Sequence, residues 1–432
     1  MKNRKALALI AILALVAAAC GGSDGGSDEA VVEVETTEAP ATTEAPTTTA
    51  APAPASDPLI LASLMPLSGD LASLGPGIAL GAALAVEQIN AAGGINGQPV
   101  QLIEGDSGCD GAVALTSLND VIAQGAQGVM GAACSGTSLA ILDTAIAAEV
   151  EMVSPSNTSP QFTKIDKKGF YARTAPSDLL QGDVLASLLV EDGVQTVSII
   201  SRADSYGRGL AEATAAAFEA AGGTVKTIVY HATDASEFTS EVTAVGKGGA
   251  DAIVGILFPE TGCGVLQPAF EQGLLDTPWY MTDGVKDAGL ASLCGLGTAL
   301  DGFKGTAPGS AAGEAKDAFE AAYAEVSADG SPTFIFAPQA YDAVMLMAIS
   351  AAANGVTGPE IASGLVAASS GGEKCIGVAC IALAADGVDV DYVGASGEIE
   401  LNAVGDPTAA TYDIWTTEGD TNPVLKSVDF GS

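Results

Sequence analysis

The chain has 432 residues, of which 16 are Lys or Arg and 53 are Asp or Glu, and its formal net charge is −37. So large an acidic excess argues against a nucleic-acid partner, which needs a basic surface to neutralise phosphates. It also argues against adhesion of the protein body to an anionic membrane. The length exceeds that of one typical domain, so we expect two.

The first twenty residues have the pattern of an export signal. A basic head precedes an uncharged stretch, residues 6–19, that is too short to span a bilayer. Small residues then lead to Cys20, and this arrangement resembles the lipobox of bacterial lipoproteins. We expect residues 1–19 to be a signal peptide and Cys20 to be the lipidated, extracytoplasmic N-terminus. The alternative is an ordinary signal peptide followed by a cysteine.

Residues 20–57 have the composition of a tether. They are built mainly from Gly, Ser, Asp, Glu, Thr, Pro and Ala, and Thr-Thr-Glu-Ala-Pro occurs at both 36–40 and 42–46. Such a stretch has too few large apolar side chains to offset the entropy of ordering. Its repeated prolines favour an extended spacer.

From Leu59 the chain alternates short apolar runs with longer runs of helical period, which is typical of a βαβ fold. The first set of predicted strands is Leu59–Met65, Val100–Glu104, Gly128–Ala132 and Met152–Ser154. The helices between them are Ile78–Ala91, Val113–Ala123 and Leu139–Ala148. After Pro176 the pattern restarts, with strands Val197–Ser201, Val225–Tyr230 and Ala252–Leu257. Its helices are Leu179–Val190, Leu210–Ala221, Phe238–Val245 and Val265–Gln272.

Six cysteines remain when Cys20 is set aside, and an even number in an exported protein indicates disulfides. Pairing of neighbours, one of fifteen possible arrangements, would join Cys109 to Cys134, Cys263 to Cys294 and Cys375 to Cys380. A zinc site is the alternative use. It is disfavoured because no Cys-x-x-Cys spacing occurs and His231 is the only histidine.

The segments that follow the predicted strands should carry the function, because ligands of parallel sheets lie beyond the carboxyl ends of the strands. These segments are rich in Ser, Thr, Gly and Asp and poor in Lys and Arg. They are residues 66–75, 106–109, 133–137, 154–158, 202–209, 258–262 and 282–285. Their composition favours a small polar ligand held by hydroxyls and backbone amides.

Several short motifs occur in order along residues 58–432. They are Met65-Pro-Leu-Ser-Gly-Asp, Ile89-Asn-Ala-Ala-Gly-Gly-Ile-Asn-Gly, Gly131-Ala-Ala-Cys-Ser, Ser154-Pro-Ser-Asn-Thr-Ser-Pro, Phe170-Tyr-Ala-Arg-Thr-Ala-Pro-Ser-Asp, Ser205-Tyr-Gly-Arg-Gly, Asp283-Gly and Gly394-Ala-Ser-Gly. Together they resemble the leucine/isoleucine/valine-type extracytoplasmic binding proteins of ABC importers.

The resemblance implies an α/β fold of the type I periplasmic binding protein kind, with two doubly wound Rossmann-like lobes and a three-strand hinge. Lobe 1 would comprise residues 58–175 plus 308–406, and lobe 2 residues 176–307 plus 407–432. The hinge would lie near 174–176, 306–308 and 405–411. The Cys109–Cys134 pair matches a disulfide of the family.

The resemblance also implies a site for an α-amino acid. Ser135 and Thr158 would donate to the ligand carboxylate, and a backbone carbonyl at Ser156 would accept from its ammonium. Asp283, where the family favours Glu, would pair with the ammonium. The alternatives are that Ser135 and Thr158 only cap helices and that Asp283 is a turn residue.

The predicted pocket walls depart from the family. Tyr206 and Phe336 match family aromatics, whereas Leu74 and Leu257 stand where amino-acid binders often carry Tyr. The departure predicts a larger or more apolar pocket. Lys286 would add a counter-charge if it faces the ligand. The alternative for Leu74, Leu257 and Phe336 is that they belong to the hydrophobic core.

Enzymatic function is not expected. Gly75-Pro-Gly77 with Gly81 resembles a dinucleotide-binding loop, but it follows the strand ending at Met65 only after a long gap. A Ser-His-Asp hydrolase would have to use His231. We therefore expect no catalytic residues, no cofactor and no metal.

The function that the resemblance implies is delivery of a solute. We expect a lipid-anchored monomer that binds a branched-chain amino acid or a related small amide. Closure of its cleft would then present the solute to the permease and ATPase subunits of an ABC importer. The alternatives are a ligand-sensing lipoprotein that acts on a separate membrane receptor and an adhesion lipoprotein without ligand-induced closure.

Overall fold

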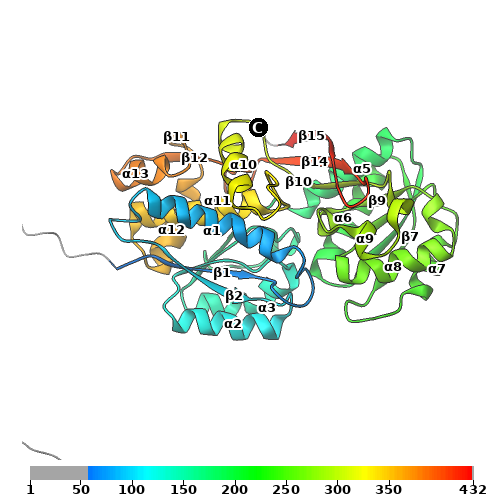
Figure 1. Cartoon of the computed structure of the whole chain (residues 1–432), viewed down its shortest axis with the longest axis horizontal. Coiled ribbons are helices and arrows are strands. Elements are labelled where there is room, and N and C mark those ends of the chain that lie inside the picture. Colours follow the sequence, from blue (N-terminus) through cyan, green and yellow to red (C-terminus); the bar gives the residue numbers. More distant parts are fainter. Residues whose placement is uncertain (1–56, 431–432) are drawn as a thin grey trace, which may run out of the picture. The chain divides into compact units, whose positions relative to one another are not determined.

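Figure 1 shows the computed structural model of the chain, which describes residues 57–430. The predicted signal peptide, Cys20 and the tether up to residue 56 lie outside the described residues. Within 57–430, no helix combines the length and the apolar character needed to cross a membrane.

A five-stranded parallel sheet has the order β2-β1-β3-β4-β5. Its strands are β1 (Ile60–Met65), β2 (Gln101–Asp106), β3 (Gly128–Gly131), β4 (Glu151–Ser154) and β5 (Tyr171–Arg173). Helix α1 (Gly75–Ala91) covers one face, and α2 (Gly111–Ala123) and α3 (Ser135–Ala147) cover the other (Figure 1). Because both faces are covered, strand residues such as Leu61 and Val129 are fully buried.

The chain returns to this sheet in its last third. The elements there are α10 (Glu314–Val326), α11 (Ala337–Asn354), α12 (Gly358–Ala368) and α13 (Ala379–Ala385), with a small sheet of β11 (Glu373–Ile376), β12 (Val390–Gly394) and β13 (Gly397–Glu398). Helix α11 is buried over most of its length, between α1 and α12. A Cβ at Gly81 would lie 2.2 Å from the Ala337 carbonyl oxygen, so the close approach of α1 to α11 requires glycine there.

A second, seven-stranded sheet has the order β15-β14-β10-β9-β8-β6-β7. Its strands are β6 (Thr196–Arg202), β7 (Thr224–His231), β8 (Ala252–Ile256), β9 (Trp279–Met281), β10 (Lys304–Pro308), β14 (Ala410–Thr416) and β15 (Val424–Phe430). The first five are parallel to one another, and β14 and β15 add an antiparallel edge. The main helices of this part are α5 (Asp178–Glu191), α6 (Ser205–Ala220), α7 (Thr239–Gly246) and α8 (Pro259–Glu271).

Two mainly parallel sheets flanked by helices confirm the predicted α/β fold. The short strand β5, the elements after residue 272, the antiparallel edge and the small third sheet were not among the predicted elements. We call the part built on the five-stranded sheet lobe 1 and the part built on the seven-stranded sheet lobe 2. The chain crosses between them three times, at residues 174–177, 309–313 and 399–409.

Several helices begin earlier than the sequence pattern predicts. Helices α3, α6 and α8 begin at Ser135, Ser205 and Pro259, whereas the apolar period suggested Leu139, Leu210 and Val265. The extra first turns are rich in Ser, Gly, Thr and charged residues and carry no apolar period. In α6 the Asp204 side chain accepts from the Gly207 amide at 2.8 Å and caps the turn. The polar residues after β3, β6 and β8 therefore lie in helical first turns, whereas Ser156 and Thr158 after β4 lie in a loop.

Three neighbouring cysteine pairs form disulfides, as the simplest arrangement predicted. They are Cys109–Cys134, Cys263–Cys294 and Cys375–Cys380. The first lies in lobe 1 beside the ends of β2 and β3, the second joins α8 to the end of α9 (Leu290–Leu293), and the third joins β11 to α13. Residues 57–430 contain no cluster of His, Cys, Asp or Glu suited to a metal ion.

Arg173 lies fully buried at the end of β5. It forms hydrogen bonds with both the third crossing and the loop after β4. Its Nε donates to Asp406 at 2.8 Å, and Asp406 belongs to the third crossing. Its Nη1 donates to the carbonyls of Asn157 and Ser159 at 3.1 and 3.0 Å. Although burial opposes it, the guanidinium holds the pKa of Asp406 below its usual range. A buried charge with this many partners fixes all three segments together.

Replacement of Asp406 by Ala should therefore be strongly destabilising, because it leaves the buried guanidinium without its counter-charge. Loss of one partner of a buried pair costs about 3–5 kcal/mol of unfolding free energy. Glu191→Ala, which breaks an exposed pair with Lys426, should cost less than about 1 kcal/mol. Urea unfolding of the mature protein measures both values, and equal losses for the two variants would contradict this role of Asp406.

Candidate ligand-binding site

A small cavity lies between the lobes at the carboxyl ends of their strands. Its lining residues are Leu71, Leu74, Ile78, Ala133, Cys134, Ser135, Ser156, Tyr206, Phe258, Asp283, Gly284 and Phe336. The volume is about 20 Å³, which is room for one water. A larger ligand would therefore enter only if the lobes part or the wall side chains move.

Six of the eight residues predicted from the sequence line this one cavity. They are Leu74, Ser135, Ser156, Tyr206, Asp283 and Phe336, which come from both lobes. Thr158 and Leu257 are buried but do not line it. The structure thus brings together most of a set that is spread over 263 residues of sequence, from 74 to 336.

On lobe 1 the cavity meets the N-terminus of α3. Ser135 is the first residue of this helix, and the preceding Cys134 gives it no side-chain cap. The first backbone N–H groups of a helix have no partner within the helix, and the helix dipole makes this end favourable for an anion. This side of the cavity can therefore bind a carboxylate through the amides and hydroxyl of the first turn.

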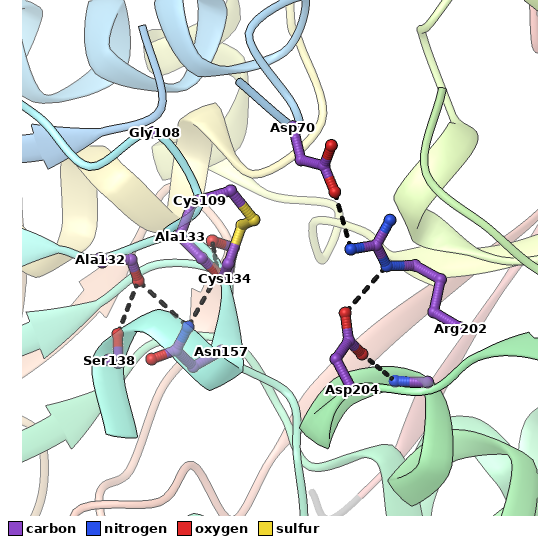
Figure 2. Close-up of a disulfide and its surroundings, with 12 residues drawn as sticks. Asp70, Gly108, Cys109, Ala132, Ala133, Cys134, Ser138, Asn157, Arg202 and Asp204 are labelled. Carbon is purple, nitrogen blue, oxygen red and sulfur yellow. Dashed lines mark hydrogen bonds and ion pairs between the residues drawn. A yellow bond between two sulfur atoms is a disulfide. The ribbon is translucent and has the colours of Figure 1, made fainter. Parts of the chain in front are cut away.

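The loop that carries Ser156 is tied to the end of β3. Asn157 Nδ2 donates to the carbonyls of Ala132 and Ala133, at 3.1 and 2.7 Å, and Ser138 Oγ donates to Ala132 at 3.2 Å (Figure 2). Ser156 Oγ also donates to the Ala133 carbonyl, at 3.1 Å. These bonds fix the two ligand loops of lobe 1 relative to each other.

The Cys109–Cys134 disulfide lies next to Ala133 and also fixes the segment between β3 and α3 (Figure 2). Cys109 lies in the turn after β2, and Cys134 immediately precedes α3, so the bond holds the start of that helix. Closure of a loop of this length lowers the entropy of the unfolded chain by the equivalent of roughly 3 kcal/mol.

On lobe 2 the cavity meets the carboxylate of Asp283, which is only 4% exposed. Its Oδ1 accepts from Gln181 Nε2 at 2.7 Å and from the Tyr206 hydroxyl at 3.0 Å. Burial raises the pKa of Asp283 to about 6, although both hydrogen bonds act in the opposite direction. Since both donors use Oδ1, the second oxygen is left for a ligand.

The remaining walls of the cavity are apolar. Leu71, Leu74 and Ile78 contribute from the β1–α1 segment. Phe258 stacks on Tyr206 with ring centroids 5.3 Å apart, and Phe336 lies in front of α11. Leu71 and Phe336 have φ angles of 63° and 61°, in the left-handed region that non-glycine residues seldom adopt. Two unusual backbone conformations thus direct large side chains at the cavity.

Three predicted contributors lie elsewhere, each for a physical reason. Thr158 has a buried hydroxyl near the Asp178 carboxyl, without hydrogen-bonding geometry. The Leu257 side chain belongs to the core, and its carbonyl packs so closely on Gly284 that a Cβ there would approach to 2.5 Å. Lys286 does not line the cavity; its Nζ lies 3.4 Å from Asp287.

The sequence did not reveal several residues of the site. Leu71, Ile78 and Phe258 are apolar residues without any signal that separates cavity walls from core. Gln181 lies just beyond the Pro-Ser-Asp motif, and glutamine carries no chemistry that would single it out. Only the fold shows that it contacts Asp283.

An ion pair spans the lobes beside the cavity. Arg202, at the end of β6, donates to Asp70 of lobe 1 at 2.8 Å and to Asp204 at 2.8 Å (Figure 2). Its guanidinium carbon lies 3.9 Å from the centre of the Phe258 ring. Ser159 Oγ of lobe 1 donates to the Ser205 carbonyl of lobe 2 at 2.9 Å. These contacts join the two lobes beside the cavity.

Comparisons with known proteins agree with this geometry. Residues 58–374 match the family model for periplasmic binding proteins. A protein of Pseudomonas aeruginosa named leucine-, isoleucine-, valine-, threonine- and alanine-binding protein is 29% identical over 68% of this chain and 78% of its own length. An amino acid binding protein of the same organism is 34% identical over 53% of this chain, but the match spans only 62% of that relative.

Solved structures show the same fold. A leucine binding protein from Thermotoga maritima has a TM-score of 0.73 and 20% identity over 86% of this chain and 98% of its own. A branched-chain amino acid transporter substrate binding protein from Streptococcus pneumoniae, in complex with isoleucine, has a TM-score of 0.72 and 22% identity over 87% and 100%. A solute binding protein from R. palustris, in complex with benzoate, has a TM-score of 0.71 and 18% identity over 87% and 98%.

The family match covers well over half of the chain, and the three structural matches cover 86–87% of it. The resemblance inferred from the sequence motifs is thereby confirmed, as is the expectation of a binding protein rather than an enzyme. The chain belongs to the periplasmic binding protein family and has the type I fold of the leucine/isoleucine/valine-type binding proteins of ABC transporters.

Proposed function

We propose that this protein binds a free α-amino acid with an apolar side chain in the cleft between its lobes. One observation carries the proposal: a single cavity has an uncapped helix N-terminus on lobe 1, a buried carboxylate on lobe 2 and apolar walls. An α-amino acid offers the three complementary groups, a carboxylate, an ammonium and a side chain. The names of the relatives, which include leucine-, isoleucine- and valine-binding proteins, support an aliphatic ligand.

Each end of the ligand has an assigned partner in this proposal. The amides at the start of α3 and the hydroxyl of Ser135 bind the carboxylate, the Ser156 carbonyl accepts from the ammonium, and Asp283 pairs with it. Thr158, in the same loop, supports the site through Asp178. Leu74, Tyr206 and Phe336 enclose the side chain, and Leu257 supports them from the core.

We further propose that closure delivers the amino acid to an ABC importer. Lobe 1 (58–175 plus 308–406) and lobe 2 (176–307 plus 407–432) rotate about the three crossings, and the closed monomer docks on the permease. Lipidation of Cys20 and the tether of residues 20–57 keep the body at the outer face of the cytoplasmic membrane. These steps rest on the family and on the sequence of the N-terminus.

Replacement of Asp283 by Asn should weaken leucine binding by at least about tenfold, because a charge-assisted hydrogen bond contributes about 1.5–3 kcal/mol. Asp276→Asn, at an exposed position of the same lobe, is the matched control and should leave the affinity unchanged. Isothermal titration calorimetry of the mature protein measures both. An unchanged dissociation constant in the folded Asp283 variant would remove Asp283 from the site.

The affinity should also depend on pH. An ammonium pairs with Asp283 only when the carboxylate is ionised, so binding is full above the pKa of about 6 and is lost as the pH falls through it. The dissociation constant for leucine should rise roughly tenfold for each pH unit below 6. Titrations between pH 8 and 5 test this, and the Asp283→Asn variant should lack the dependence. A flat profile for the wild type would rule out an ionised Asp283 as the partner.

Loss of the ion pair between the lobes should mainly affect ligand release. Asp70→Asn removes the negative charge that pairs with Arg202, which keeps Asp204, and we expect about a fivefold faster dissociation with little change in thermal stability. Asp143→Asn, exposed on the same lobe, is the control. Stopped-flow dissociation of leucine measures the rate, and equal rates for both variants would show that the pair does not hold the closed form.

A further inference from the structure

Gln181 connects Asp283 to strand β10, which leads into the second crossing between the lobes. It lies one turn into α5, directly after the first crossing, and it is fully buried. Its Nε2 donates to Asp283 Oδ1 at 2.7 Å. The same nitrogen lies 3.2 Å from the Thr306 carbonyl oxygen and 3.4 Å from Thr306 Oγ1. Thr306 belongs to β10, the strand that leads into the second crossing.

We propose that Gln181 is a positioning residue of the ligand site, which holds the Asp283 carboxylate toward the ammonium and ties it to β10. The proposal rests on the proposed function, because it takes Asp283 as the ammonium partner. It assigns a role to a residue that neither lines the cavity nor touches the ligand.

The geometry of the carboxylate supports this role. Gln181 and Tyr206 both donate to Oδ1, so they fix the plane of the carboxylate and leave Oδ2 for the ligand. Tyr206 is itself held by Thr282, whose Oγ1 lies 2.9 Å from its hydroxyl. A buried carboxylate without such donors would lose much of its charge, because desolvation favours the neutral form.

The position of Gln181 also links the proposed binding of an amino acid at Asp283 to the proposed movement of the two lobes. It follows the first crossing and contacts the strand that precedes the second, so Asp283 cannot shift without a change in this amide bridge. Beside it, the Asp178 amide donates to the carbonyl of Thr158 in lobe 1 at 2.7 Å. The first turn of α5 therefore contacts a ligand loop of lobe 1, the acidic residue of lobe 2 and β10.

Other ionisable groups lie close to Asp283. Asp178 of α5 is fully buried, and neither of its oxygens has a hydrogen bond among the described residues. Burial and then the charge of Asp283 raise the pKa of Asp178, while Arg173 of β5 has the opposite effect. Tyr206 of α6 and Tyr412 of β14 also lie close. Burial raises the pKa of Asp283, and the Gln181 hydrogen bond opposes that rise and so helps to keep the carboxylate ionised.

The test is the titration of Asp283 in the ligand-free mature protein, followed by carboxyl ¹³C NMR in the wild type and in Gln181→Leu. Loss of one hydrogen bond to the carboxylate should raise the midpoint by about one pH unit. Gln339→Leu is the matched control: Gln339 is equally buried and donates to Gly309 of the second crossing at 3.0 Å, without contacting Asp283. It should leave the midpoint unchanged.

Leucine titrations of the same variants give the second readout. In Gln181→Leu, the pH below which affinity is lost should be higher than in the wild type. At high pH the affinity should return to near the wild-type value. A general packing defect would instead lower the affinity at every pH. Gln181→Met serves if the Leu variant fails to fold. An unchanged Asp283 midpoint in a folded variant overturns the proposal. If no amino acid binds while the midpoint still shifts, the proposed function fails and the hold of Gln181 on Asp283 stands.

Discussion

The site depends on one constraint, the burial of the Asp283 carboxylate beneath apolar walls. A buried charge costs several kcal/mol unless hydrogen bonds or an opposite charge compensate it. Gln181 and Tyr206 supply two hydrogen bonds, and the pKa nevertheless remains raised, so the compensation is incomplete. In the proposed binding mode, a ligand ammonium would supply the missing compensation. Asp283 would then contribute to binding because the folded protein alone leaves its charge incompletely compensated.

The contacts around the cavity differ within lobe 1 and between the lobes. In lobe 1 the Cys109–Cys134 disulfide, the Asn157 amide and the buried Arg173 fix the ligand loops to the sheet. Between the lobes lie the Arg202–Asp70 ion pair and the hydrogen bond from Ser159 to the Ser205 carbonyl. Such a distribution suits a cleft that opens by rotation of two preformed halves.

The sequence predicted the fold well because buried strands and amphipathic helices differ in period and length. It missed β5 and every element after residue 272, including the antiparallel strands β14 and β15, and it placed the starts of α3, α6 and α8 too late because their first turns have no apolar period. For the site, motif resemblance found the residues with distinctive chemistry, such as Ser135 and Asp283. It could not find Leu71 or Gln181, whose roles arise from a left-handed backbone conformation and from a contact between residues 102 positions apart.

Recognition of both ends of an amino acid is the central claim, and calorimetric titration of the mature protein with three ligands tests it most directly. The ligands are leucine, leucinamide, which lacks the carboxylate, and 4-methylpentanoate, which lacks the ammonium. Leucine should bind, and each analogue should bind at least about tenfold more weakly, since each leaves one buried polar partner unpaired. If 4-methylpentanoate bound as tightly as leucine, Asp283 would have no ammonium to recognise and the account would be contradicted.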